Sequence, residues 1–148
     1  MTLRLAELTP ENLPAAVRLR LAPGQERFVA PVVESVAEAY VTPTAWPRVV
    51  LDDDEVVGFV MANFDPDHEL PEFRAGVWRL SVAAGAQGRG VGRFAVDQVA
   101  AEARRRGVRR ITVLWEQGEG GPEGFYLRLG FVVTGELSGE TVGTLELG

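Results

Sequence analysis

The spacing of apolar residues in the first part of the chain predicts a strand followed by two helices. Leucines alternate with polar residues over 2–8, which is the period of a strand. Thr9 and Pro10 suit the N-cap and the first position of a helix that is expected to run to about Leu21. A Pro-Gly break follows, and Pro31 is expected in the first turn of a second helix. The apolar stripe of that helix would consist of Val29, Val32, Val33, Val36 and Tyr40.

The middle of the chain has the pattern of a hairpin, a strand and a long helix. Two apolar runs enclose an acidic turn over 52–55, which is typical of a β-hairpin. A further strand is expected over 75–84, and the apolar spacing then becomes helical from about Gly90 to a C-cap at Gly107. The core face of this helix would consist of Gly92, Ala95, Val96, Val99 and Ala103.

The last part of the chain predicts strands over 109–116, 131–137 and 140–147, with a short helix over 121–130. Hairpins therefore occur together with one strand–helix–strand crossover, which predicts an α/β fold, or α+β by stricter counting. We expect a mixed central sheet of about seven strands flanked by about four helices. No repeat or linker interrupts the pattern, so residues 1–148 are expected to form a single domain.

The charge balance and the absence of cysteine exclude several functions. The chain has 15 basic and 21 acidic residues, with a net charge of -6. Nucleic acids and anionic membranes bind clustered positive charge, so neither is an expected partner, whereas a cationic substrate fits. The lack of cysteine excludes disulfides, thiolate zinc sites and a cysteine nucleophile. No apolar run has the length of a signal peptide or a membrane span, so we expect a cytoplasmic protein.

Glycines alternate with other residues at Gly88, Gly90 and Gly92, where the long helix is expected to begin. A helix N-terminus exposes unpaired N–H groups, and glycines let an anion approach those groups closely. Arg89 and Arg93 add positive charge, so this segment predicts a phosphate cradle. A nucleoside-triphosphate loop would need a lysine and a hydroxyl residue after the last glycine, and a dinucleotide fingerprint would need that glycine one residue later. A glycine-rich packing turn without a ligand is the competing interpretation.

The segment from Gln87 to Gly92 resembles the Q-x-x-G-x-G signature of the GNAT superfamily of N-acyltransferases. Residues 78–86 resemble the central strand of the family where it enters the pyrophosphate loop. Residues 124–136 resemble its later segment, in which a tyrosine on a short helix precedes Gly-Phe. The order of the predicted elements agrees with the family over the whole chain. Residues 25–40 are more loosely similar to the polyamine acetyltransferase branch.

This resemblance implies a GNAT fold that uses acetyl-CoA as a co-substrate. It implies that the coenzyme lies where the strands over 77–83 and 111–116 splay apart. Pantetheine amides would pair with the backbone of the first of these strands, and the pyrophosphate would accept backbone N–H groups of the glycine-rich loop. The coenzyme-binding residues implied in this way are Leu80, Ser81, Val82, Gln87, Gly88, Arg89, Gly90, Val91, Gly92 and Arg93.

Acetyl transfer to an amine also makes chemical demands on single residues. The amine must lose a proton, because the pKa of a lysine-like ammonium is about 10.4. Negative charge that develops on the thioester oxygen must be stabilised, and the family pattern suggests the backbone N–H of Val82. The departing thiolate must gain a proton, for which Tyr126 matches the tyrosine acid of the family, with a core tyrosine as the competing interpretation. Because the chain has no cysteine, we expect direct transfer without an acetyl-enzyme.

The acceptor side is expected to be acidic. Glu34 and Glu38 lie one turn apart on the second predicted helix, which borders the acceptor site in the family, and they are the predicted substrate-binding residues. A solvated helix face is the competing interpretation of this pair. Acidic residues also crowd the segment 65–72 and would form an acidic rim. Several family members carry an acid on the central strand, but this chain has Trp78 and Arg79 there, so no general base is assigned.

The sequence thus predicts an N-acetyltransferase that moves an acetyl group from acetyl-CoA to a primary amine of a small molecule. A polyamine is the favoured acceptor, because separated cations gain from several carboxylates. Acetylation of a protein N-terminus or lysine is an alternative, and a non-catalytic module that binds coenzyme A is another. His68 is given no role, and no metal site is predicted because no set of residues has ligand spacing. The acceptor and the oligomeric state stay open, with a homodimer among the assemblies to test.

Overall fold

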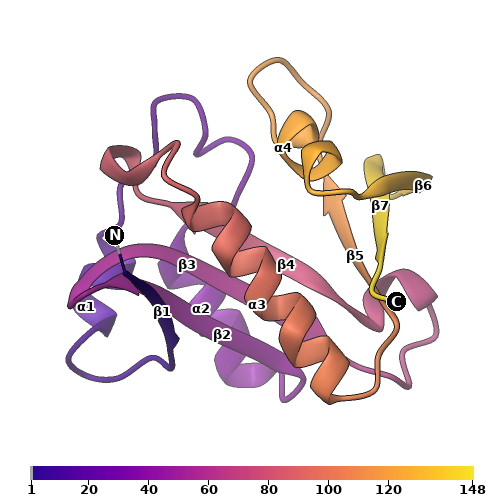
Figure 1. Cartoon of the computed structure of the whole chain (residues 1–148), viewed down its shortest axis with the longest axis horizontal. Coiled ribbons are helices and arrows are strands. Elements are labelled where there is room, and N and C mark those ends of the chain that lie inside the picture. Colours follow the sequence, from indigo (N-terminus) through magenta and orange to yellow (C-terminus); the bar gives the residue numbers. More distant parts are fainter. Residues whose placement is uncertain (1) are drawn as a thin grey trace.

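A computed structural model describes residues 2–148, which form one mixed sheet with helices on both faces (Figure 1). The strands are β1 (Leu3–Ala6), β2 (Ala45–Asp52), β3 (Glu55–Phe64), β4 (Ala75–Val82), β5 (Arg110–Trp115), β6 (Val132–Leu137) and β7 (Glu140–Glu146). The helices are α1 (Leu13–Val17), α2 (Val32–Val41), α3 (Val91–Arg105) and α4 (Glu123–Arg128). Short 3-10 turns occur at Pro71–Phe73 and Ala84–Ala86.

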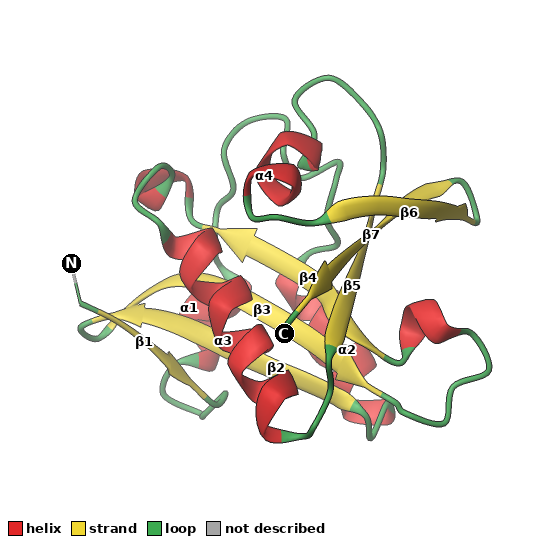
Figure 2. Cartoon of the chain, turned by 45° about the vertical axis from the view of Figure 1, so that its right-hand side comes forward, coloured by secondary structure: helices red, strands yellow, loops and turns green. Residues whose placement is uncertain are grey.

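The sheet has the strand order β1-β2-β3-β4-β5-β7-β6. All neighbouring strands are antiparallel except β4 and β5, which are parallel and are connected through α3. α3 lies across one face, and α1 and α2 cover the other (Figure 2). The predicted fold class, a mixed sheet of seven strands flanked by four helices, is confirmed. Among residues 2–148, no helix is long and apolar enough to cross a lipid bilayer.

Each face of the sheet carries its own hydrophobic core. Successive side chains of a strand point to opposite faces, so Phe59 packs in the cluster under α1 and α2 while Val60 packs in the cluster under α3. The face of α3 that its helical period predicted is buried, with Ala95 and Val99 fully enclosed. These two cores hold β3 and β4 rigidly in the middle of the sheet, next to the point where the sheet opens.

The sheet opens because β4 and β5 pair only near their N-terminal ends, through Gly76 with Thr112 and Val77 with Val113. A Cβ at Gly76 would lie 2.2 Å from the carbonyl oxygen of Thr112, so only glycine allows this close approach. Beyond this point β4 stays paired with β3, and a bulge inserts Trp78 into β4 as an extra residue. The strands therefore diverge towards their C-terminal ends, as the family resemblance implies (Figure 1).

The first helix is shorter than the sequence predicts. The prediction covers 10–21, whereas α1 spans Leu13–Val17. Thr9 and Asn12 hydrogen-bond each other's backbone N–H groups, so the chain forms a turn before the helix begins. After the helix, the carbonyl oxygen of Arg20 accepts a backbone N–H from the loop that follows β4, at 2.7 Å. This tertiary hydrogen bond holds the chain out of the helix and overrides the local periodicity.

The predicted apolar stripe of α2 is wrong at three of its positions. Val29 lies in the loop before the helix, which begins at Val32. Val33 is 60% exposed and Tyr40 is 90% exposed, whereas Ser35 is fully buried. An ion pair between Glu38 and Arg79 of β4 turns the acidic side of the helix towards β4. Because a helix has only one inward face, this rotation moves Val33 and Tyr40 outward.

Candidate active site

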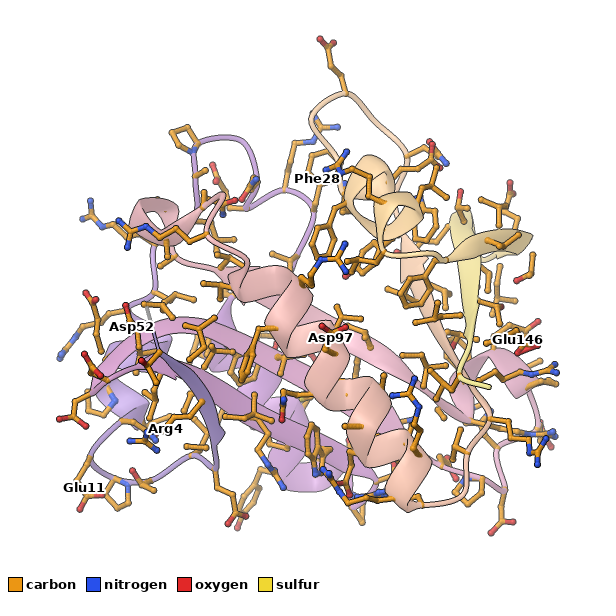
Figure 3. The ribbon with its side chains drawn as sticks, viewed as in Figure 1. Arg4, Glu11, Phe28, Asp52, Asp97 and Glu146 are labelled. Carbon is orange, nitrogen blue, oxygen red and sulfur yellow. The ribbon has the colours of Figure 1, made fainter. Side chains whose placement is uncertain are left out.

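A cavity of about 1380 Å³ opens where β4 and β5 diverge. It lies at the C-terminal ends of these parallel strands, where ligands commonly bind in α/β sheets. Residues 25–31 before α2 form one wall, and residues 120–122 with α4 form the opposite wall. Phe28 lies between the two walls (Figure 3), so close that a Cβ at Gly121 would be 3.1 Å from its ring. No sequence pattern indicates Phe28, because only the fold brings these loops together.

The glycine-rich loop presents an uncapped helix N-terminus to this cavity. Gly90 is the N-cap of α3, and no side chain caps the helix. Within residues 2–148, no backbone N–H from Gly88 to Arg93 donates to a protein acceptor, and the first N–H to bond back to the loop is that of Phe94. These free donors, together with the positive end of the helix dipole, fit an anion such as a pyrophosphate.

The glycines of this loop are needed for two different physical reasons. Gly88 and Gly90 have φ values of +76° and +82° with open space where a Cβ would lie, so their backbone conformation requires glycine. A Cβ at Gly92 would instead lie 2.9 Å from the ring of Phe125 on α4. Gly92 thus lets α4 pack closely onto α3, which is the packing role of the competing interpretation.

The other residues of the loop differ in where their side chains lie. Arg93 lines the cavity, whereas Arg89 is exposed and does not line it. Val91 is 1% exposed and packs in the core, so it can offer a ligand only its backbone. Gln87 donates from Nε2 to the carbonyl oxygen of Val82 at 3.2 Å and thereby ties the loop to the end of β4.

β4 turns backbone groups of Leu80 and Val82 towards the cavity, and of these the carbonyl oxygen of Val82 already accepts from Gln87 Nε2. The N–H of Ala83 donates to a carbonyl oxygen of β3 at 2.9 Å. Hydrogen-bonded positions alternate in an antiparallel ladder, so Ser81 also bonds to β3, while Leu80 and Val82 direct their backbone groups to the other edge. β5 has diverged from that edge, and both residues line the cavity. The structure thus leaves the N–H of Val82 available as an oxyanion donor.

Tyr126 combines a core ring with a hydroxyl at the cavity. The ring is 5% exposed and stacks on Trp115, with the two centroids 5.5 Å apart. Within residues 2–148 the hydroxyl has no protein hydrogen bond. Every fully enclosed polar side-chain atom there has a hydrogen-bond partner, so the hydroxyl is not fully enclosed and reaches the open space of the cavity. Burial raises the pKa of Tyr126 well above its ordinary value of about 10.0. A phenol of ordinary pKa is already protonated at neutral pH, so burial only widens the pH range over which Tyr126 keeps its proton.

The two predicted acceptor carboxylates lie in unequal environments. Arg79 Nη2 is 2.9 Å from Glu38 Oε1 and 3.9 Å from Glu34 Oε2, and the Arg79 side chain is only 16% exposed. Glu38 therefore forms the closer ion pair with Arg79, whereas Glu34 lies farther from Arg79, is 59% exposed and lines the cavity. In the sequence, Arg79 stands out only as a departure from the family pattern. Its position beside α2 depends on the bulge at Trp78, which no sequence pattern indicates.

Part of the acidic segment 65–72 lines the cavity near the start of β4, namely Asp65 and Glu72. His68 lines it as well, and its Nδ1 accepts the backbone N–H of Leu70 at 3.0 Å.

Charged side chains of both signs line the cavity. Three arginines lie near the glycine-rich loop and α4, namely Arg27, Arg93 and Arg128, and Arg79 places a fourth beside Glu34. The carboxylates along β4 and at its start are Glu34, Asp65 and Glu72, and Glu26 and Glu140 add negative charge elsewhere. Within the described residues, no group of three or more His, Asp or Glu is placed to hold a metal ion. The arrangement suits an anion at one end of the cavity and a cation at the other.

Solved structures share this fold over nearly the whole chain. An acetyltransferase from Thermus thermophilus has a TM-score of 0.78 and 24% identity, with 99% of this chain and 97% of that chain covered. The ribosomal-protein-S18-alanine N-acetyltransferase from Escherichia coli has a TM-score of 0.70 and 16% identity, with 99% and 94% covered. An aminoglycoside 6'-N-acetyltransferase complexed with coenzyme A has a TM-score of 0.72 and 18% identity, with 97% of each chain covered. No curated protein matches the chain by sequence.

A family model described as "Acetyltransferase (GNAT) family" matches residues 16–131. The matched span contains the glycine-rich loop, the diverging strands β4 and β5, and Tyr126. The resemblance that the loop 87–92 first indicated is thereby confirmed at the level of the family. The chain belongs to the GNAT family of acetyltransferases.

Proposed function

We propose that this protein transfers the acetyl group of acetyl-CoA directly to a primary amine of a small cationic molecule. The observation that carries the proposal is the uncapped N-terminus of α3, which opens into the same cavity as the free edge of β4. Membership of the family makes acetyl-CoA the acetyl donor. Its pyrophosphate fits the backbone donors from Gly88 to Arg93, and its pantetheine amides fit the backbone groups of Leu80 and Val82.

The proposed reaction forms one C–N bond and breaks one C–S bond. The neutral amine nitrogen attacks the thioester carbonyl carbon, and the N–H of Val82 donates to the carbonyl oxygen as negative charge develops on it. When the C–S bond breaks, the sulfur leaves as a thiolate and takes the proton of Tyr126, which water then restores. The protons that the amine nitrogen loses pass to water in the open cavity.

The cationic character of the acceptor is supported by the carboxylates along β4. Glu34, Asp65 and Glu72 line this part of the cavity, while Glu38 is already paired with Arg79. An exposed ion pair contributes at most about 1 kcal/mol, so an amine with several separated charges gains more than a monoamine. We therefore favour a polyamine. Two neighbours are named for a protein alanine and for an aminoglycoside, so the fold alone does not choose the acceptor.

The release of free coenzyme A thiol in the presence of an amine panel tests this proposal. The panel contains spermidine, a monoamine of matched length, an aminoglycoside, an amino acid and a peptide with a free N-terminus. We expect the highest kcat/KM with spermidine. The chain has no lysine, so acetylation of its own side chains cannot contribute to the signal.

Each other outcome of the panel replaces one part of the proposal. Turnover with the peptide alone would assign the enzyme to protein acetylation. Bound coenzyme without thiol release for any amine would indicate a non-catalytic binding module instead.

A further inference from the structure

The indole of Trp115, at the end of β5, stacks on one face of the Tyr126 ring. The two rings lie 5.5 Å apart at an interplanar angle of 15°, and Trp115 is 2% exposed. The six-membered ring of the indole also approaches β7, where a Cβ at Gly143 would be 2.5 Å from it. Glycine at this position therefore leaves room for the indole beside the phenol. Any tilt of the indole would be passed on to Tyr126.

The orientation of this indole is set by Glu123 in the first turn of α4. Glu123 Oε2 accepts the Trp115 Nε1–H at 3.0 Å. The same oxygen also accepts from Gln117 Nε2, which in turn donates to Thr141 Oγ1 of β7 at 2.9 Å. The carboxylate is thus fixed from both sides, and it connects α4 to β5 and β7 at the position of the acid.

α4 needs such contacts because it is too short to be stable alone. It has six residues, and isolated helices of this length do not persist in water. The Tyr126 hydroxyl has no protein hydrogen bond within residues 2–148, so only packing directs it. Phe125 contacts Gly92 on the α3 side, and Phe131 meets the phenol edge-to-face with centroids 5.5 Å apart. Trp115 is the one of these partners whose own orientation is fixed by a hydrogen bond.

We propose that Glu123 and Trp115 are positioning residues that aim the Tyr126 hydroxyl at the reacting sulfur. Glu123 fixes the indole through its N–H, and the indole face fixes the plane of the phenol. A shift of about 1 Å in a reacting group can cost about a hundredfold in rate. The proposal rests on the proposed function, because it assumes that Tyr126 is the acid.

A double-mutant cycle between Glu123→Ala and Tyr126→Phe tests the proposal, with kcat and the KM for acetyl-CoA measured separately. We expect Glu123→Ala to lower kcat by about tenfold to a hundredfold, with little change in this KM. In the Tyr126→Phe background, Glu123→Ala should cause no further loss, because its effect passes through the hydroxyl. Glu123→Gln keeps an oxygen that can accept the indole N–H, so it should stay within about threefold of the wild type.

The matched control is Glu119→Ala, which removes an exposed carboxylate from the neighbouring loop and should leave kcat unchanged. If Glu123→Ala does not fold, Trp115→Phe carries the same cycle, because it keeps a ring beside Tyr126 and removes the N–H. Full kcat in either folded variant, an additive loss in the Tyr126→Phe background, or an equal loss in Glu123→Gln overturns the proposal.

Failure of the underlying assignment is distinguishable from failure of this inference. Full turnover by Tyr126→Phe alone removes Tyr126 as the acid and takes the positioning role with it. Impaired turnover by Tyr126→Phe together with an unimpaired Glu123→Ala removes only the positioning role. Thiol release by the wild-type protein tests acetyl transfer separately from both.

Discussion

The coenzyme end and the acceptor end of the cavity are built from different parts of the chain. At the coenzyme end the donors are backbone N–H groups, placed by the start of α3 and the open edge of β4. At the acceptor end the charges are carried by side chains, and an ion pair with Arg79 already occupies Glu38. The positions of backbone donors change only when the fold changes, whereas a single substitution alters the charge of a wall that is formed by side chains. Substitutions at the acceptor end should therefore change which amine reacts, and those at the coenzyme end should affect every amine alike.

The largest effect is expected at Tyr126, which lies between the two ends. Tyr126→Phe keeps the packing with Trp115 and removes only the hydroxyl. Loss of a general acid should lower kcat by about a hundredfold to ten-thousandfold, with the affinity for coenzyme A little changed. Steady-state kinetics and coenzyme titration measure the two quantities. Tyr40→Phe, at the 90% exposed second tyrosine, is the control, and equal kcat in both variants would assign Tyr126 to the core.

The second largest effect is expected at Gly90, and it tests whether the glycine-rich loop binds the coenzyme. Coenzyme A at about 100 times its Kd should stabilise the wild-type protein by about 2.7 kcal/mol. Gly90→Asp places bulk and negative charge among the free N–H groups and should remove most of the thermal shift.

Gly107→Asp is the matched control for that substitution. Gly107 lies beyond the other end of α3, with a φ of +77° close to the +82° of Gly90 and with equally open space. Its strain is therefore comparable, but its distance from the cavity should leave the coenzyme-induced shift intact. Equal shifts in the two folded variants would remove the pyrophosphate from the glycine-rich loop.

A smaller effect is expected at the acceptor end, and it tests whether charge there selects the amine. Glu34→Gln combined with Glu38→Gln removes both carboxylates beside Arg79 and should raise the KM for spermidine several-fold, at about 1 kcal/mol or less per pair. The KM for acetyl-CoA should not change. The preference of the wild type for spermidine over a monoamine should also shrink as salt rises, because the Debye length falls from about 10 Å at 0.1 M to about 3 Å at 1 M.

Two controls accompany the measurements at the acceptor end. Glu11→Gln neutralises an exposed carboxylate at the far side of the molecule (Figure 3) and should leave both KM values unchanged. A spermidine preference that ignores salt, or that survives the double substitution, would remove the polyamine and leave acetyl transfer in place.

The smallest effect is a change in the pH dependence of stability. Burial raises the pKa of Tyr126, so the folded protein keeps this proton at a pH at which the unfolded chain has lost it. The free energy of unfolding should therefore fall as pH rises above about 10, and it should fall less steeply in Tyr126→Phe. Denaturant unfolding at several alkaline pH values measures the slopes, with Tyr40→Phe as the control. Parallel slopes in all three proteins would contradict the burial of this phenol.

Most of the fold could be predicted from the sequence, as could the glycine-rich helix start that we propose holds the coenzyme, because the signals of both are local. The strand period before the loop, the glycines of the loop and the helix period after it lie within about thirty residues, and the structure keeps them together. The roles of Gly90 and Gly92 could not be separated in this way. Glycine is required at Gly90 by its own backbone angle, whereas it is required at Gly92 by the ring of Phe125, which lies far along the chain.

The acceptor end was the least predictable part. The sequence places Glu34 and Glu38 on one helix, but it does not show that Arg79 pairs with Glu38 and leaves Glu34 at the cavity. The mistaken stripe of α2 has the same origin, because periodicity identifies apolar positions without saying which of them will turn inward.

By itself, the sequence determined the order of the elements and the family, and it supports the proposal that the glycine-rich loop accepts an anion. Only the tertiary structure decided which carboxylate lies closer to Arg79, how β4 turns its backbone to the cavity and what packs against Tyr126. The reason is physical. Helix starts, turns and strand period depend on residues a few positions apart, whereas an ion pair, a bulge between strands and a stack of rings depend on groups that meet only after folding.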